Sequence, residues 1–414
     1  MNTIDTGAAA APRSPLRMKT LTKTDNAPIR ILVVDDEPDL ALLIRQRFRK
    51  RVRASEFEFL FAENGAEALK LLGERSDIDI VLTDINMPVM DGLTLLAKLA
   101  QLDRLLKSVV VSAYGDMENI RTAMNRGAFD FLTKPIDFRD LEITLDKTIS
   151  ELDKLREGAQ AKGRLIAVKR ELDLASDLQM SILPREIPPT PGHAAFDIHA
   201  CMVPAREVGG DFYDFFLLNG HLLGFVIGDV AGKGVPGAIY MAVSRTIIRA
   251  TALTCVSPDC CLTHANNVLC CENSTDLFVT LVYGTLDLRT GEVVYTNAGH
   301  NPPYLLTSNG EARELENQGG LVLGVFDGFE YGSSSLTLQP GEALFLYTDG
   351  VTEAMRADHE LFGADRLRSM LSPSNATSMA RLTGAIREEL DTFAEAHPQH
   401  DDITMLGLRY LGPA

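Results

Sequence analysis

The chain has 414 residues, of which 45% are hydrophobic and 23% charged, and this length favours two or three domains over a single core. Its formal net charge of −17 argues against a protein that binds nucleic acid or anionic membranes through a broad basic surface. No apolar run approaches the roughly 20 residues that span a bilayer, and the start lacks the apolar core of a signal peptide, so we expect a cytoplasmic protein.

The N-terminal third alternates strand-like and helical patterns. Residues 1–28 are rich in Ala, Thr and Pro without periodicity, which predicts a disordered tail. Over residues 29–140, the strand-like runs are Ile31 to Val34, Phe57 to Phe61, Ile80 to Leu82, Val109 to Val111 and Phe129 to Leu132. Each is followed by a helical period, and five such units predict a doubly wound α/β domain with five parallel strands.

Residues 141–190 read as a helical linker that stops at Pro184. The alternating three- and four-residue steps of a coiled-coil seam recur at Leu165, Val168, Leu172, Ala175, Gln179 and Ile182. Gly158 and Gly163 interrupt an earlier seam, so we expect a broken helix. Two interpretations stay open: a coiled coil that pairs two chains, and an amphipathic helix that lies on its own domain.

Residues 191–414 mix alternating strands with two helical stretches. The strand-like runs are Leu222 to Ile227, Phe278 to Leu286, Val293 to Asn297, Ala343 to Tyr347 and Thr404 to Leu408. The helical segments lie near Ala238 to Leu253 and Ala380 to Ala396, and a hairpin turn spans Asp287 to Gly291. We therefore predict a separate α+β domain with mostly antiparallel pairing.

Polar residues follow the predicted strands of the N-terminal domain. They are Asp35, Asp36, Asp84, Ser112 and Lys134. In a parallel sheet these strand ends share one edge, where doubly wound folds bind their ligands. Three carboxylates at that edge would coordinate one Mg²⁺ and leave a nucleophilic oxygen on one of them. A lysine and a hydroxyl beside them would complete a pocket for a phosphoryl group.

These residues, with the segment from Leu82 to Gly92 and with Lys134-Pro135, resemble the receiver domains of two-component response regulators. The resemblance covers roughly Arg30 to Ser150. It implies that a histidine kinase phosphorylates Asp84, and that Asp35, Asp36 and Asp84 bind Mg²⁺. It also implies that Ser112 and Lys134 contact the phosphoryl oxygens and that Phe131 is the aromatic switch. A receiver that folds but no longer signals through phosphorylation is the alternative.

In the C-terminal domain, two apolar runs each end in one aspartate, Asp229 and Asp349. A charge at the end of a buried strand is unfavourable unless it is exposed or paired with a cation. Glycines follow both aspartates, so a main-chain carbonyl near Val230 could be a further ligand. Carboxylate oxygens suit Mg²⁺ or Mn²⁺, and a two-metal site hydrolyses phosphate esters. We find no Cys-x5-Arg loop, Gly-x-Ser-x-Gly elbow or Walker loop, so the pattern predicts a metal-dependent phosphatase.

Roughly Asp197 to Tyr410 resembles the PP2C-type serine/threonine phosphatases, specifically the bacterial SpoIIE and RsbU group. The motifs, in the family's order, are Gly-Gly-Asp211-Phe-Tyr-Asp214, Gly-Asp229-Val-Ala-Gly-Lys-Gly, Asn297-Ala-Gly-His300, Thr-Asp349-Gly-Val-Thr-Glu and Asp401-Asp402-Ile-Thr404. The resemblance implies a β-sandwich flanked by helices. Within it, two Mn²⁺ or Mg²⁺ ions are held by Asp211, Asp229, Asp349 and Asp401 with the Val230 carbonyl. It leaves open the roles of Asp214, Lys233, His300 and Asp402.

Two functions follow from these resemblances. In the first, receiver phosphorylation controls a phosphatase that acts on a phosphorylated anti-sigma factor antagonist in a partner-switching pathway, with the linker helix forming a homodimer. In the second, the C-terminal domain has lost catalysis and serves as an adaptor for a sigma factor or its regulator, as in RssB. All four metal aspartates are present, which favours the enzyme. The sign of the control by Asp84, the natural substrate and the cognate kinase cannot be deduced.

The six cysteines lack the density and spacing of a disulfide framework, so we expect reduced thiols. Cys260, His264 and Cys271 could share one helical face, which raises the hypothesis of a zinc site. Their spacing matches no standard zinc motif. We therefore favour a role in the core or in an interface.

Overall fold

The computed structural model describes residues 27–113, 115–185, 195–272, 276–316, 320–371, 378–395 and 397–413. The tail predicted over residues 1–28 falls almost entirely outside these described residues. The chain forms two compact units, Met1–Leu165 and Ile166–Ala414. Among the described helices, none is both long enough and apolar enough to cross a membrane.

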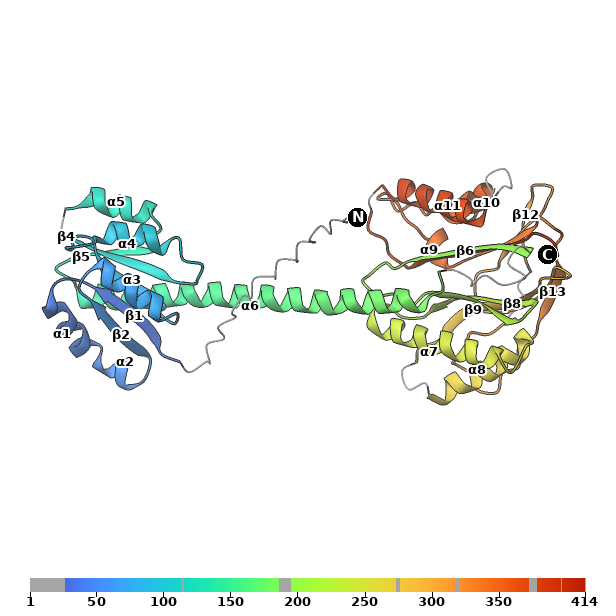
Figure 1. The fold of residues 1–414 in the computed structure, drawn as a ribbon, viewed down its shortest axis with the longest axis horizontal. Coiled ribbons are helices and arrows are strands. Elements are labelled where there is room, and N and C mark those ends of the chain that lie inside the picture. The colour runs from blue at the N-terminus through green and yellow to red at the C-terminus, as the bar shows by residue number, and fades with distance from the viewer. Residues whose placement is uncertain are drawn as a thin grey trace, which may run out of the picture. The chain divides into compact units, whose positions relative to one another are not determined.

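The N-terminal unit is a five-stranded parallel sheet with strand order β2-β1-β3-β4-β5 (Figure 1). Its strands are β1 (Ile29–Val34), β2 (Phe57–Ala62), β3 (Ile80–Asp84), β4 (Lys107–Ala113) and β5 (Asp130–Lys134). Its helices are α1 (Pro38–Arg47), α2 (Arg49–Arg53), α3 (Gly65–Glu74), α4 (Gly92–Leu99), α5 (Met117–Asn125) and the beginning of α6 (Phe138–Ile182). The predicted doubly wound α/β fold is confirmed.

The apolar runs of this unit are buried because helices cover both faces of the sheet. Along β1, Ile31 and Val33 pack into the core on one face, while Leu32 and Val34 pack into the core on the other. Successive side chains of a strand point to opposite faces. A continuous β-branched run therefore marks a strand that is covered on both sides.

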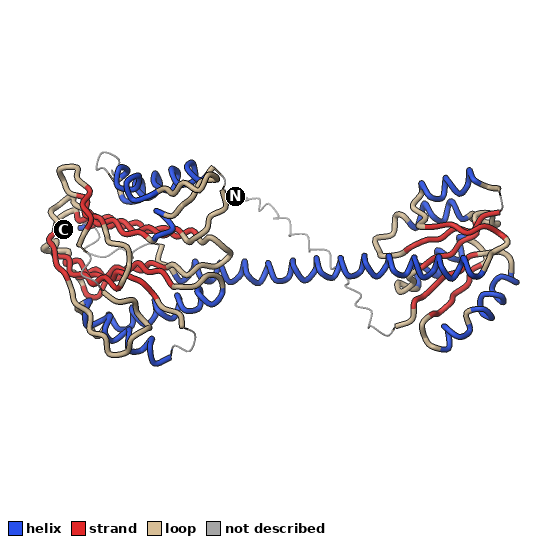
Figure 2. Tube along the Cα trace, turned by 180° about the vertical axis from the view of Figure 1, so that it is seen from behind, coloured by secondary structure: helices blue, strands red, loops and turns tan. Residues whose placement is uncertain are grey.

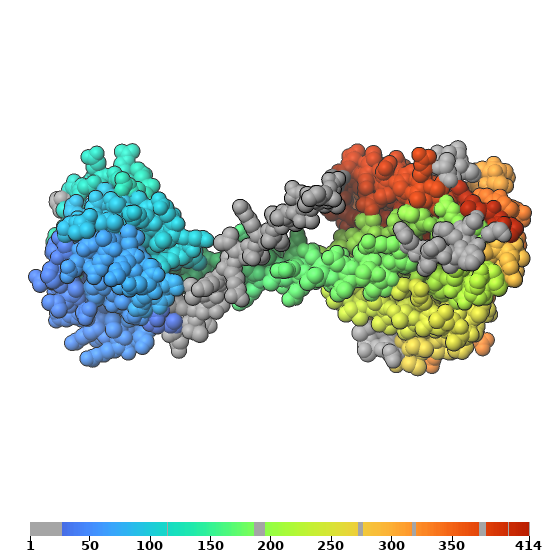
Figure 3. Space-filling model, viewed as in Figure 1, coloured from blue at the N-terminus to red at the C-terminus, as the bar shows by residue number. Residues whose placement is uncertain are grey.

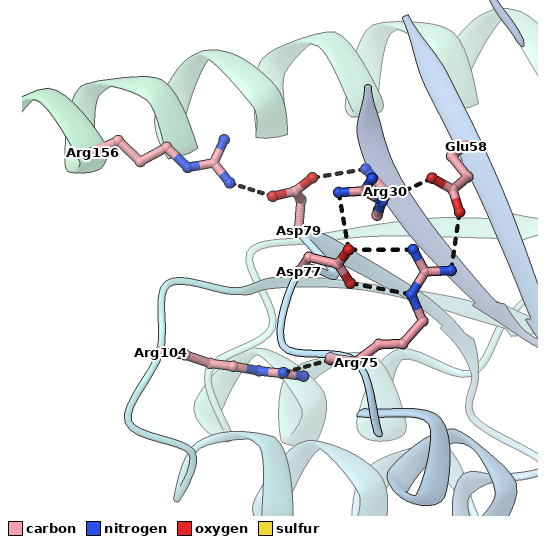
Figure 4. A network of polar contacts seen from close by, with 7 residues as sticks. All are labelled: Arg30, Glu58, Arg75, Asp77, Asp79, Arg104 and Arg156. Atoms are coloured by element: carbon pink, nitrogen blue, oxygen red, sulfur yellow. Dashed lines mark hydrogen bonds and ion pairs between the residues drawn. The ribbon is translucent and has the colours of Figure 1, made fainter. Parts of the chain in front are cut away.

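An ion-pair network closes the edge of the sheet where the strands begin. Figure 4 shows its members, which are Arg30, Glu58, Arg75, Asp77, Asp79 and Arg156, together with Arg104, which donates to the Arg75 carbonyl. Arg30 pairs with Glu58 at 2.7 Å and with Asp77 at 3.0 Å. The backbone N–H of Arg30 donates to Asp79 Oδ2 at 2.7 Å, and Arg156 of α6 pairs with the other oxygen of Asp79. The buried Asp79 carboxylate thus attaches α6 to the start of the central strands.

Helix α6 is continuous over 45 residues, so the prediction of a break at Gly158 and Gly163 is wrong. Glycine weakens a helix by about 1 kcal/mol relative to alanine. Unlike proline, it keeps the N–H that the helical hydrogen bond needs. Packing supplies the remaining stability, because Leu141 and Leu145 are buried in the core of the N-terminal unit.

The C-terminal unit contains two five-stranded sheets, ordered β13-β10-β9-β8-β7 and β12-β11-β14-β15-β6, with antiparallel neighbours throughout. The strands are β6 (Phe196–Val203), β7 (Phe212–Asn219), β8 (Leu222–Val230), β9 (Val279–Asp287), β10 (Glu292–Ala298), β11 (Tyr304–Leu306), β12 (Ala312–Glu314), β13 (Ser334–Thr337), β14 (Ala343–Tyr347) and β15 (Ile403–Tyr410). The helices are α7 (Val235–Ala252), α8 (Pro258–Glu272), α9 (Asp349–Thr352), α10 (Gly363–Met370) and α11 (Met379–Ala394). The sheets lie between helical layers (Figure 2), which confirms the predicted α+β class.

The core of this unit has two layers that meet at the second sheet. Along β14, Leu344 and Leu346 belong to the cluster shared with the first sheet. Phe345 and Tyr347 belong to the cluster that includes Met379 of α11. The strand is therefore buried on both faces, and it holds the residues that follow its end in a fixed place.

The glycines of α6 give a test of this helix. Nothing lies within 4 Å of a Cβ built on Gly158 or Gly163, so the double change to alanine should stabilise α6 by about 1–2 kcal/mol. Hydrogen–deuterium exchange of peptides from residues 155–168 should then slow roughly fivefold or more. Gly73→Ala, which also has open space around the new Cβ, is the control and should leave this segment unchanged. Unaltered exchange in the double variant would contradict a continuous helix.

Candidate functional site

The carboxyl ends of β1, β3 and β5 bring three predicted metal ligands of the N-terminal unit together. Asp35, Asp36 and Asp84 each place one carboxylate oxygen within 4.8 Å of the others. Lys134, the last residue of β5, places Nζ 2.7 Å from Asp84 Oδ2 and 3.1 Å from Asp35 Oδ2. Three carboxylates and one lysine leave net negative charge, which fits a hard divalent cation such as Mg²⁺.

Burial sets the charge state of this site. Asp84 is only 6% exposed, and its Oδ1 accepts the backbone N–H of Asn86 at 3.2 Å. Burial raises the pKa of Asp35, and hydrogen bonds to Glu37 and Lys134 oppose this effect. Burial alone would lower the pKa of Lys134, but its hydrogen bonds to Asp84, Glu37 and Asp35 raise that pKa above its ordinary value. Lys134 is therefore a permanent cation beside Asp84.

The other predicted residues of this unit lie on the neighbouring strands. Ser112 of β4 is fully buried, and its hydroxyl has no hydrogen-bond partner among the described residues. The side chain of Phe131 on β5 is 39% exposed. Glu37 was not singled out from the sequence, yet its Oε1 lies 3.0 Å from Lys134 Nζ. The acidic run Asp35-Asp36-Glu37 was the signal for it.

In the C-terminal unit, the four predicted aspartates lie at the ends of strands from both sheets. Asp211 precedes β7 and Asp229 is near the end of β8, while Asp349 begins α9 after β14 and Asp401 precedes β15. Asp211 is only 1% exposed, and Thr348 Oγ1 donates to its Oδ2 at 2.7 Å. This hydrogen bond joins the residue before β7 to the residue after β14, and so connects the two sheets.

Burial and neighbouring carboxylates raise the pKa of three of these aspartates, Asp211, Asp229 and Asp349. Burial raises the pKa of Asp211 well above its ordinary value, and repulsion from Asp229 and Asp402 adds to this. Burial, followed by repulsion from Asp349, raises the pKa of Asp229 to about 7. Burial and the charge of Asp401 raise the pKa of Asp349. Such a group of oxygen ligands fits hard divalent cations, whose charge would offset the repulsion.

Lys233 neutralises part of this charge. Its Nζ lies 2.8 Å from Asp401 Oδ2 and donates to the His400 carbonyl at 2.8 Å. The resemblance to the phosphatase family left the role of Lys233 open. In the structure it is the ion-pair partner of a predicted metal ligand.

Asp402, whose role the sequence left open, shapes the loop before Asp211. Its Oδ1 accepts the N–H of Ala205 at 2.8 Å, and its Oδ2 accepts the N–H of Gly210 at 2.6 Å. A Cβ on Gly209 would lie 2.1 Å from Asp402 Oδ2. This loop therefore needs glycine at position 209, and Asp402 fixes the backbone that carries Asp211.

Gln179 of α6 holds the same loop from the other side. Its Nε2 donates to the Gly209 carbonyl at 2.6 Å, and its Oε1 accepts the Gly209 N–H at 3.0 Å. Gln179 is buried, whereas the sequence placed it on a coiled-coil seam. A polar residue among apolar seam positions was the only signal of this role.

Asp214 and His300 have structural partners. The Asp214 carboxylate pairs with Arg245 and Arg249 of α7, each at 2.9 Å, which ties α7 to β7. His300 is buried, and its Nδ1 lies 2.8 Å from Thr280 Oγ1. Burial lowers the pKa of His300 to about 4, so the ring is neutral at pH 7.

Comparison with known families finds a separate match for each half of the chain. The response regulator receiver domain matches residues 31–146, and the family described as Stage II sporulation protein E (SpoIIE) matches residues 219–411. The chain therefore joins a receiver domain to a SpoIIE-type phosphatase domain. The second match includes Asp229, Asp349 and Asp401, whereas Gln179 and Asp211 lie before it.

Three relatives extend this result. Protein IcfG of Synechocystis sp. is 32% identical over 58% of this chain, which spans only 41% of that relative. The phosphoserine phosphatase RsbU of Bacillus subtilis is 26% identical over 66% of this chain and 79% of its own length. The solved SiaA-PP2C domain of Pseudomonas aeruginosa, 26% identical, aligns with a TM-score of 0.52 over 60% of this chain and 98% of its own. This likeness confirms the predicted PP2C-like fold.

The raised pKa of Asp229 predicts an unusual stability profile for the metal-free protein. Its pKa is about 7 in the folded state against an ordinary 3.8, so the folded protein loses stability as pH rises from about 4 through about 7. In chelator above pH 7, Asp229→Asn should be more stable than the parent by about 1–3 kcal/mol. With Mn²⁺ the order should reverse, because the parent alone gains the full binding energy.

Thermal unfolding of the phosphatase domain measures this effect. Asp327→Asn, which changes an exposed aspartate far from any predicted ligand in sequence, is the matched control and should behave like the parent in both buffers. If Asp229→Asn is less stable than the parent in chelator at pH 8, the assigned charge repulsion is wrong.

Proposed function

We propose that this chain is a response regulator in which phosphorylation of the receiver controls a Mn²⁺- or Mg²⁺-dependent protein serine/threonine phosphatase. The repulsion that links Asp211 to Asp229, Asp229 to Asp349 and Asp349 to Asp401 carries this proposal, because such closely spaced negative charge calls for cations. Together with the carbonyl of Val230, these carboxylates would hold two ions.

The cations would activate water and offset the charge of the phosphate ester. The protein's own residues hold the ligands in place. Thr348 fixes one oxygen of Asp211, and Asp402 fixes the backbone N–H of Gly210 beside it. Because these ligands are already fixed, they need little reorganisation during the reaction. Such preorganisation is the main source of electrostatic catalysis. Such a site needs no serine or cysteine nucleophile.

In the receiver, Asp84 would accept the phosphoryl group from a histidine kinase. Asp35 and Asp36 would hold Mg²⁺ with Asp84, while Lys134 and Ser112 would contact the phosphoryl oxygens. In the structure, Lys134 donates to Asp84 Oδ2. A phosphoryl group on Asp84 would redirect this lysine and shift the receiver, with Phe131 as the switch residue, between two conformations.

Helix α6 offers the physical connection between the two domains. Within the receiver, Leu145 is part of the core and Arg156 binds Asp79. Within the phosphatase domain, Gln179 of the same helix holds Gly209 by two hydrogen bonds. We infer that a displacement of α6 alters the loop that carries Asp211, and with it the metal site.

The proposed substrate is a phosphorylated anti-sigma factor antagonist, and the similarity to RsbU, named a phosphoserine phosphatase, supports this class. The proposed dimer would form through α6, part of whose surface is uncovered in Figure 3. Leu165, Ile166 and Val168 are 69%, 60% and 52% exposed on this helix. A second copy of the helix would bury them.

Hydrolysis assays on the full chain test the function. With Mn²⁺, the protein should hydrolyse p-nitrophenyl phosphate and a phosphorylated antagonist protein. Asp229→Ala and Asp349→Ala should each lower kcat by a factor of about 100 or more. Asp84→Ala should abolish the difference between activity with and without acetyl phosphate, whereas Asp103→Ala, an exposed receiver aspartate, should preserve it. If neither substrate is hydrolysed under any condition, the enzyme proposal fails and the adaptor function remains.

The Gln179 contact can be tested separately. Gln179→Ala removes both hydrogen bonds to Gly209, so kcat should fall about tenfold with little change in KM, and excess Mn²⁺ should partly restore it. Gln179→Glu keeps the acceptor but loses the donor, so its kcat should lie between those of the parent and Gln179→Ala. Asp177→Ala, an exposed neighbour on α6, is the control. Full activity in a folded Gln179→Ala variant would refute a role for α6 in forming the site.

A further inference from the structure

A second group of metal-ligand side chains lies at the turn between α7 and α8. Cys255 lies in the loop that follows α7, and Cys260 and His264 lie one turn apart near the start of α8. Each offers one ligand atom within 4.8 Å of the other two. The sequence hypothesis grouped Cys260 and His264 with Cys271. In the structure the third member of the group is Cys255, not Cys271. A helical pattern cannot show this pairing, because Cys255 reaches the helix from a preceding loop.

The distances within this group match a tetrahedral metal site. The sulfurs of Cys255 and Cys260 lie 3.6 Å and 3.7 Å from Nδ1 of His264. With Zn–S of about 2.3 Å and Zn–N of about 2.0–2.1 Å, tetrahedral geometry puts sulfur and nitrogen about 3.6 Å apart. Both observed separations therefore leave room for one ion between the three ligands.

Backbone hydrogen bonds hold these ligands in place without a metal. The Cys255 N–H donates to the Thr251 carbonyl at 2.8 Å, and the Cys261 N–H donates to the Ser257 carbonyl at 3.0 Å. The buried thiol of Cys261 contacts the Ile248 carbonyl of α7 at 3.6 Å. Ligands that are ordered in advance lose little entropy when they bind an ion.

The site is also accessible to solvent, and its ligands can lose the protons that a metal ion would replace. Cys255 and Cys260 are partly exposed and His264 is exposed. His264 Nδ1 lies 2.9 Å from the Cys260 carbonyl oxygen, which accepts a hydrogen bond from its N–H. A bound cation replaces that proton and the two thiol protons, and the other ring nitrogen then carries the N–H.

We propose that Cys255, Cys260 and His264 form a binding site for one thiophilic divalent cation, Zn²⁺ in the first place, with a fourth position open to water or to a group from another molecule. Two sulfurs and one imidazole select a softer metal than the carboxylates of the phosphatase site do. The ion would fasten the loop after α7 to the first turns of α8. Because Asp214 ties α7 to β7, the ion would brace the helix pair that packs on the sheet carrying Asp229.

Cobalt binding to the reduced, chelator-stripped full-length protein tests this site. Cobalt held by thiolates shows a sulfur-to-metal charge-transfer band, whereas cobalt at the carboxylate site does not. The parent should show this band and lose it on addition of one equivalent of Zn²⁺. Cys255→Ser and Cys260→Ser should abolish the band, and His264→Ala should weaken Zn²⁺ binding roughly tenfold or more.

Two cysteines of the same helix serve as controls. Cys270→Ser and Cys271→Ser should keep the band, and circular dichroism should show that every variant is folded; Cys255→Ala replaces Cys255→Ser if the latter is not. Absence of the band in the parent overturns the proposal, and so does a band that survives loss of both Cys255 and Cys260. Isolation of a Cys255–Cys260 disulfide from a protein whose reduced form binds no Zn²⁺ also overturns it.

Discussion

Buried negative charge at the junction of two β-sheets is the constraint on which the phosphatase domain depends. Asp211 is almost completely shielded from water and is fixed by the hydroxyl of Thr348. Strands buried on both faces hold these residues, so the carboxylates cannot separate to relieve their repulsion. A cation is the simplest means of offsetting this charge. The fold therefore maintains an unfavourable arrangement that a bound cation would relieve.

The two acidic sites of the chain use similar ligands but differ in their counter-charge. In the receiver, Lys134 contacts both Asp35 and Asp84, so part of the charge is balanced without any ion. In the phosphatase domain, Lys233 contacts Asp401 at the rim, while Asp211 and Asp229 repel each other. The first arrangement fits the proposed gain and loss of a phosphoryl group, and the second fits the proposed binding of cations.

The sequence was sufficient where function or burial imposes a local pattern. Continuous apolar runs predicted the parallel sheet, and short acidic motifs predicted both sets of aspartates. It was insufficient where distant segments meet. Gln179 looked like a seam residue, and the role of Asp402 stayed open, because their partners at Gly209 and Gly210 lie far along the chain. The prediction of a break at Gly158 was wrong for another reason. The free-energy cost of glycine in a helix is real, but it is small compared with the stability that packing gives to α6.

The contact between Gln179 and Gly209 is the step by which we propose that helix α6 acts on the aspartate site. Both hydrogen bonds go to one backbone unit that lacks a side chain, so the loop can follow the helix without a steric barrier. Gly210, the next residue, is bonded to Asp402, and Asp211 follows it. A small displacement of α6 must therefore either break a buried hydrogen bond or move the backbone of Asp211. A buried amide left without partners costs about 1–3 kcal/mol, so the coupling that we propose requires the backbone at Gly209 to follow Gln179.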